Sequence, residues 1–232
     1  MLDALTAEEW TAVALSLRVS FWATLISLPL AILVAHALAR WQFWGKTLLN
    51  GLVHLPLILP PVVTGYLLLV TFGRKGLVGQ YLDQWFGLVF AFRWTGAALA
   101  AAVMAFPLMV RAIRLAIEAV DPRLEDAAST LGASRIFVFG TITLPLILPG
   151  IVAGVVLAFA KAMGEFGATI TFVASIPGQT QTLPSAIYAL LQVPGGEDRV
   201  PRLVLVAVAV AMGALILSEW VSRGIARRIA GK

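Results

Sequence analysis

The residues of this chain that could carry out chemistry are few, and their spacing supports none of the common reactions. Residues 45–47 read Gly-Lys-Thr, the end of a phosphate-binding loop, but Arg40 stands where that motif needs its first glycine. The two histidines, His36 and His54, are not spaced as a zinc-binding pair. The chain has no Gly-x-Ser-x-Gly motif and no cysteine. We therefore expect a protein that is not an enzyme and that binds no metal and no cofactor.

Charged residues inside apolar runs form a second group of interest, because a charge within a bilayer is costly unless it is paired or hydrated. Arg18 lies in the first such run, and we expect its side chain to extend outward to the membrane surface. Lys161 and Glu165 are four residues apart in another run, where one helix face would let them pair. Two roles remain open for this pair, a structural ion pair or a gate that a moving substrate passes.

The composition predicts that membrane-spanning helices position these residues. Hydrophobic residues make up 60% of the chain and charged residues 12%, and the mean hydropathy is +0.93. Apolar runs long enough to cross a bilayer, which takes roughly 20 residues, occur at residues 11–38, 47–72, 94–117, 142–165 and 202–222. We predict an all-α membrane protein with five transmembrane helices, in which residues 1–232 form a single domain in the lipid bilayer.

The basic residues predict the orientation of the chain. An odd number of spans places the termini on opposite sides of the membrane, and loops rich in Lys and Arg stay in the cytoplasm. The richer side holds Arg40, Lys46, Arg111, Arg114, Arg123, Arg135, Arg223, Arg227, Arg228 and Lys232. We expect a periplasmic N-terminus, a cytoplasmic C-terminus and a cytoplasmic loop at residues 118–141. Orientation alone accounts for the net charge of +5, so we expect no nucleic-acid partner.

A proline-rich segment breaks the helical pattern of the second span. Residues 55–61 read Leu-Pro-Leu-Ile-Leu-Pro-Pro, which a regular helix cannot accommodate, because each proline lacks a donor and clashes with the preceding turn. Irregular backbone at membrane depth has to be buried in protein or line a hydrated cavity. A kinked helix entry and a cavity-lining segment both remain open. The candidate path or gate residues are Pro60, Pro61, Thr64, Lys161, Glu165 and Thr169.

The most informative segment is a small amphipathic insert, residues 126–145, between two long apolar runs. It indicates two short helices hinged at Gly132, with Asp126 near the start of the first. Small alanines in the first helix leave a surface that a partner can approach closely, and Phe139 adds to the apolar contacts of the second. We predict a docking surface that consists of Asp126, Ala127, Ala128, Leu131, Gly132, Ile136 and Phe137.

The spacing in this insert resembles the cytoplasmic loop of permease subunits of binding-protein-dependent ABC importers. That pattern is Glu-Ala-Ala, three residues, Gly, nine residues and Ile-x-Leu-Pro, and it is matched in register by Ala127, Ala128, Gly132, Ile142, Leu144 and Pro145. Asp126 departs from the pattern and keeps the charge of the usual glutamate on a shorter stem. Similarity to permeases of molybdate importers, and less closely to sulfate and thiosulfate permeases, extends over residues 55–79, 105–118, 164–173 and 182–197.

This resemblance implies a fold, a set of partners and a function. The implied fold is the type I ABC importer permease fold, which is MetI-like. A homodimer of the chain would form the pore, two cytoplasmic ATP-binding subunits would dock on its loops, and a periplasmic molybdate-binding protein would deliver the substrate. The expected function is import of molybdate or tungstate across the inner membrane. Alternatives are a sulfate or thiosulfate permease, and a helical channel or ion-coupled carrier that needs no ATPase.

Overall fold

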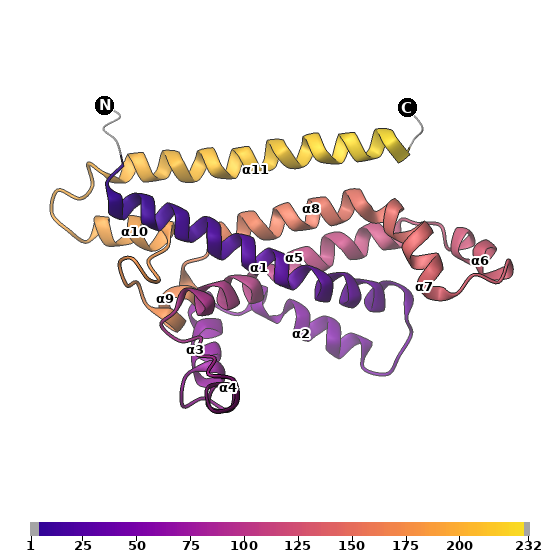
Figure 1. Cartoon of the computed structure of the whole chain (residues 1–232), viewed down its shortest axis with the longest axis horizontal. Coiled ribbons are helices and arrows are strands. Elements are labelled where there is room, and N and C mark those ends of the chain that lie inside the picture. The colour runs from indigo at the N-terminus through magenta and orange to yellow at the C-terminus, as the bar shows by residue number, and fades with distance from the viewer. Residues whose placement is uncertain (1–4, 230–232) are drawn as a thin grey trace.

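The computed structural model describes residues 5–229, and within that range the chain is helical without any strand (Figure 1). The predicted all-α fold is confirmed. In chain order the helices are α1 (Ala7–Arg40), α2 (Lys46–Ile58), α3 (Pro61–Phe72), α4 (Gly79–Phe86), α5 (Trp94–Glu118), α6 (Pro122–Thr130), α7 (Arg135–Val138), the π-helix η1 (Phe139–Thr143), α8 (Leu144–Met163), α9 (Gly167–Val173), α10 (Leu183–Leu191) and α11 (Val200–Ile229).

Within the described residues, four helical stretches are long and apolar enough to cross a membrane: α1, α5, the continuous run Arg135–Met163, and α11 over Val200–Leu217. The remaining predicted span, residues 47–72, is a pair of helices, α2 and α3, that are bent by 115°. The bend lies at Leu59 and Pro60, because residues before a proline are driven out of the helical conformation. Counted as one broken span, this pair completes the predicted five.

The centre of the bundle is formed by α1, α5 and α8, which pack against one another (Figure 1). Their contact faces are rich in alanine, and Ala35 of α1 and Ala100 of α5 have no exposed surface. Gly150 of α8 lies so close to α5 that a Cβ atom there would be 2.2 Å from the Cβ of Ala116. In lipid, helices associate through close van der Waals contact, which small residues permit. The small residues of α8 thus bring it close to its neighbours within one chain.

Different short helices lie at the two ends of the bundle (Figure 1). At one end, the start of α1 lies beside α10 and the start of α11, where Glu9 Oε1 accepts a hydrogen bond of 3.0 Å from Arg199 Nε. The short helices α6 and α7 lie at the opposite end, to which α11 runs. The first residue of α1 and the last residue of α11 are therefore at opposite ends of the bundle, as an odd number of crossings requires.

Candidate functional site

The predicted docking insert contains two short helices, α6 and α7, joined at a left-handed glycine. Gly132 has a φ angle of +86°. Its N–H donates to the carbonyl of Ser129 at 3.0 Å, and the N–H of Ala133 donates to the carbonyl of Ala128 at 3.2 Å. This pair of bonds around a left-handed residue is the Schellman motif, which ends α6 and reverses the chain. The structure thus contains the predicted hinge at Gly132.

Three large apolar side chains of the hinge region are exposed. Leu131 is 89% exposed, Ile136 86% and Phe137 61%, and Ala127 beside them is also exposed. We call Leu131, Ile136 and Phe137 the apolar patch. Large apolar side chains that a protein leaves exposed can mark an interface with another protein. The arrangement suits the predicted docking surface, whose role stays a prediction.

Two residues of the insert lie elsewhere than predicted. α6 begins at Pro122, because Asp121 caps it by accepting a 3.0 Å hydrogen bond from Arg123 N–H and proline favours the first helical position. Asp126 is therefore in the middle of α6, and its expected place at the helix start is wrong. Phe139 is also not part of the exposed surface, because its ring packs edge-on against His36 with 5.1 Å between centroids.

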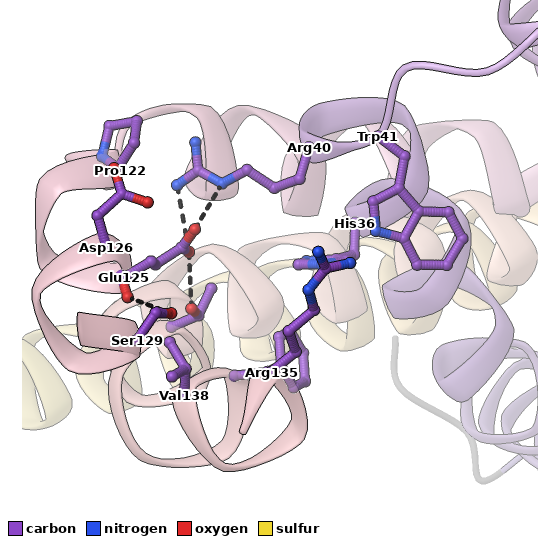
Figure 2. A pocket seen from close by; sticks show the side chains of 11 residues that line it. His36, Arg40, Trp41, Pro122, Glu125, Asp126, Ser129, Arg135 and Val138 are labelled. Atoms are coloured by element: carbon purple, nitrogen blue, oxygen red, sulfur yellow. Dashed lines mark hydrogen bonds and ion pairs between the residues drawn. The ribbon is translucent and has the colours of Figure 1, made fainter. Parts of the chain in front are cut away.

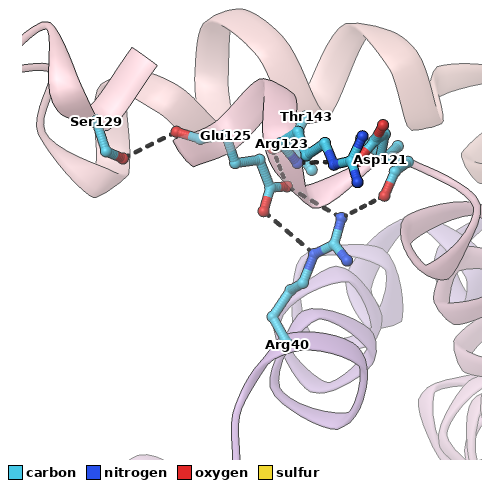
Figure 3. Close-up of polar contacts among 7 residues, drawn as sticks. Arg40, Asp121, Arg123, Glu125, Ser129 and Thr143 are labelled. Carbon is cyan, nitrogen blue, oxygen red and sulfur yellow. Dashed lines mark hydrogen bonds and ion pairs between the residues drawn. The ribbon is translucent and has the colours of Figure 1, made fainter. Parts of the chain in front are cut away.

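Glu125, which no sequence pattern indicated, joins α6 to the membrane helices (Figure 3). Its Oε2 lies 3.2 Å from Arg40 Nε, and its Oε1 accepts hydrogen bonds from Arg40 Nη2 at 3.3 Å and Thr143 Oγ1 at 2.7 Å. Arg40 Nη2 also donates to the carbonyl of Val120 at 2.9 Å. The Arg40 and Glu125 side chains are only 17% and 20% exposed. Hydrogen bonds to a shielded carboxylate are stronger than neutral ones, so these contacts hold α6 in place.

A cavity of about 410 Å³ lies beside these contacts, between α6, α7 and the end of α1 (Figure 2). His36 and Arg40 of α1 and the adjoining Trp41 line it on one side, and Asp126 and Arg135 line it from the insert. Charged side chains of both signs thus line the space between the insert and α1. Ile136 lines a neighbouring apolar hollow with Pro29 and Leu33 of α1.

The candidate path residues on α3 and α9 lie in two helices that pack closely on each other. A Cβ atom on Gly65 would be 2.5 Å from the carbonyl oxygen of Ala168, so only glycine lets α3 approach α9 this far. Thr64 is 5% exposed, and its hydroxyl has no hydrogen-bond partner within the described residues. Thr169 is buried and donates to the carbonyl of Phe166 at 2.9 Å. The bend at Pro60 places these two helices together, and a role in transport stays a prediction.

Lys161 and Glu165 form the predicted ion pair, with 2.7 Å between Nζ and Oε2. They do not share a helix face as expected, because α8 ends at Met163 and Glu165 lies beyond it. Glu165 is 2% exposed, and its Oε1 accepts a 3.0 Å hydrogen bond from the N–H of Ala168 in α9. Both carboxylate oxygens therefore join α8 to α9, and the role of the pair as a gate stays a prediction.

The guanidinium carbon of Arg18 lies 3.8 Å from the centroid of the Trp94 ring, at the first residue of α5 and thus at the end of a predicted span. Such a cation–π contact stabilises a charge at the edge of an apolar region. The expected extension of Arg18 to the membrane surface stays a prediction.

The comparison with known proteins agrees with this architecture. Residues 27–231 match the family described as "Binding-protein-dependent transport system inner membrane component". The chain belongs to this family, and it is a transport subunit of the ABC permease class that crosses the membrane several times. The predicted type I importer permease fold is confirmed.

Particular members of the family differ widely in their similarity to this chain. It is 61% identical over 228 residues to the molybdenum transport system permease protein ModB of Escherichia coli (strain K12), covering 98% of this chain and 99% of that one. It is 34% identical over 206 residues to the sulfate transport system permease protein CysT of Salmonella typhimurium, covering 89% and 73%. A bacterial alginate ABC transporter superposes with a TM-score of 0.75 at 20% identity, covering 95% and 80%, which shows a shared fold.

Proposed function

We propose that this chain is the permease subunit of an ATP-driven importer that carries molybdate across the inner membrane. The observation that supports this most directly is the 61% identity, over 98% of the chain, to a permease named for molybdenum transport. The 34% identity to a sulfate permease makes sulfate the less favoured substrate. Tungstate, which has the same charge and a similar shape, is expected to follow the same path.

The proposed assembly consists of two copies of this chain, two cytoplasmic ATP-binding subunits and a periplasmic binding protein. The apolar patch of α6 and α7 is the proposed contact with the ATP-binding subunit, because it is exposed and lies at one end of the bundle. That end would face the cytoplasm, with the start of α1 in the periplasm, in agreement with the distribution of basic residues. ATP binding would draw the two ATP-binding subunits together and move the patches with them.

The permease would supply a path for the anion rather than a tight binding site. Two cations of the predicted spans are already engaged, Lys161 by Glu165 and Arg18 by Trp94. A dianion that met a strong fixed cluster of positive charge would be released slowly, whereas alternating access requires release on each cycle. Selection among anions would therefore rest with the separate binding protein.

Uptake of radiolabelled molybdate and sulfate by cells that lack this chain, and by the same cells with the chain restored, tests the proposal. We expect restoration to recover molybdate uptake much more than sulfate uptake. Recovery of sulfate uptake alone would reassign the substrate. A chain that supports uptake but does not copurify with an ATP-binding subunit would instead be a channel or an ion-coupled carrier.

A further inference from the structure

Helix α6 has no hydrophobic anchor of its own on the membrane helices. None of its residues is buried, and its main contacts are with α7 and η1. Burial of apolar surface is the usual means by which a short helix is held on a protein. Since α6 lacks it, polar contacts have to define where this helix sits.

The polar contacts converge on the carboxylate of Glu125, and they come from the end of α1 and from the last residue of η1 (Figures 2 and 3). Arg40 is the last residue of α1, and Thr143 is the residue directly before α8. The same guanidinium of Arg40 holds the carbonyl of Val120, in the link between α5 and α6. We call Arg40, Glu125 and Thr143 the junction. The junction joins α6, the end of α1 and the residue before α8 at one point.

We infer that Glu125 is a positioning residue that transmits the motion of the docked α6 to α1 and α8. This inference rests on the proposed function, because only an ATP-binding subunit bound to the apolar patch would move α6. A pull on α6 reaches Arg40 and Thr143 through short contacts of 2.7 to 3.3 Å. The shielding of the pair from solvent keeps these contacts strong.

The covalent route from α6 to α8 is longer than the contacts of the junction. It runs through the left-handed turn at Gly132, then α7 and the five-residue π-helix η1. π-Helical turns are rare in proteins and occur frequently at functional sites. The hydrogen bond from Thr143 to Glu125 joins α6 directly to the end of η1 and so bypasses this longer route.

Glu125→Gln tests the inference, because the amide keeps the size of the side chain and an acceptor for Thr143 but loses the charge that Arg40 requires. The matched control is Glu118→Gln, which breaks the 2.7 Å pair of Glu118 with Arg114 at the same end of the bundle. Each permease is reconstituted in liposomes with its ATP-binding subunits and loaded binding protein. Copurification, ATP hydrolysis and molybdate uptake are measured on the same preparations.

We expect Glu125→Gln to copurify normally and to hydrolyse ATP, while the molybdate taken up per ATP falls roughly fivefold or more, the usual size of an allosteric coupling. The control should keep the wild-type ratio. Thr143→Val removes only the hydroxyl donor and should lower the ratio in the same direction by a smaller factor. If Glu125→Gln does not accumulate in the membrane, Thr143→Val alone decides.

An unchanged ratio in both junction variants would overturn the inference. So would a loss of uptake that is proportional to a loss of copurification, because Glu125 would then serve docking. The wild-type chain tests the proposed function separately. If it transported sulfate but not molybdate, the substrate would be wrong and the same ratio, measured with sulfate, would still decide the role of Glu125.

Discussion

Replacing Gly132 with valine should disconnect ATP hydrolysis from transport while leaving the membrane helices intact. Gly132 has a φ angle of +86°, and a Cβ atom built there would meet nothing within 4 Å. The cost of a side chain is therefore a backbone cost, since there is no neighbour to displace. L-residues in the left-handed region lose roughly 1–2 kcal/mol, and β-branched residues lie at the upper end or beyond it.

That cost predicts an order among substitutions. At about 1.4 kcal/mol for each factor of ten, valine should lower the population of the native hinge roughly tenfold to thirtyfold. Asparagine tolerates the left-handed region better than alanine does, although its side chain is larger. Molybdate uptake by Gly132 variants should therefore decrease from asparagine to alanine to valine.

Uptake per copy of the chain in the membrane, measured together with copurification of the ATP-binding subunit, checks this order. Gly45 provides the matched control, because it has a φ angle of +94°, has equally open surroundings and lies outside the insert. Gly45→Val should carry the same backbone cost without a loss of coupling. A decrease that followed side-chain volume, with asparagine worse than alanine, would refute the reasoning about the hinge, as would wild-type uptake by Gly132→Val.

Three further predictions follow from the described contacts. Charge reversal at Lys161 or Glu165 alone should lower the amount of folded chain. The double reversal should recover only part of this loss, because a lysine at position 165 cannot accept a hydrogen bond from the N–H of Ala168. Full recovery of folded protein in the double variant would contradict this prediction. Ile136→Glu should abolish copurification of the ATP-binding subunit without lowering the amount of permease, since this side chain is 86% exposed, and retained copurification would exclude it from the interface. Gly65→Val should lower the thermal unfolding temperature in detergent by several degrees, because the new Cβ atom would lie 2.5 Å from the backbone oxygen of Ala168. An unchanged unfolding temperature would show that α3 can shift on α9 without cost.

The local elements of this protein could be predicted from its sequence. Apolar runs located the membrane helices, since a bilayer selects long stretches of nonpolar side chains whatever their partners are. The bend near Pro60 and the left-handed turn at Gly132 were equally predictable, because proline and glycine act on their own backbone. The insert indicated the class of protein because the residues that match the family pattern lie within one short segment of the sequence.

Only the tertiary structure decided which distant residues meet. Glu125 and Arg40 are 85 residues apart, and each is one of many charges in the chain, 12 acidic and 17 basic. Their pairing depends on how α1 and α6 are rotated and how closely they approach, which results from the packing of the alanine-rich helix faces. The contact of Glu165 with the start of α9 depends likewise on where α8 ends. Hydropathy and spacing carry no information on such angles and distances, so the junction could be found only once the helices were placed.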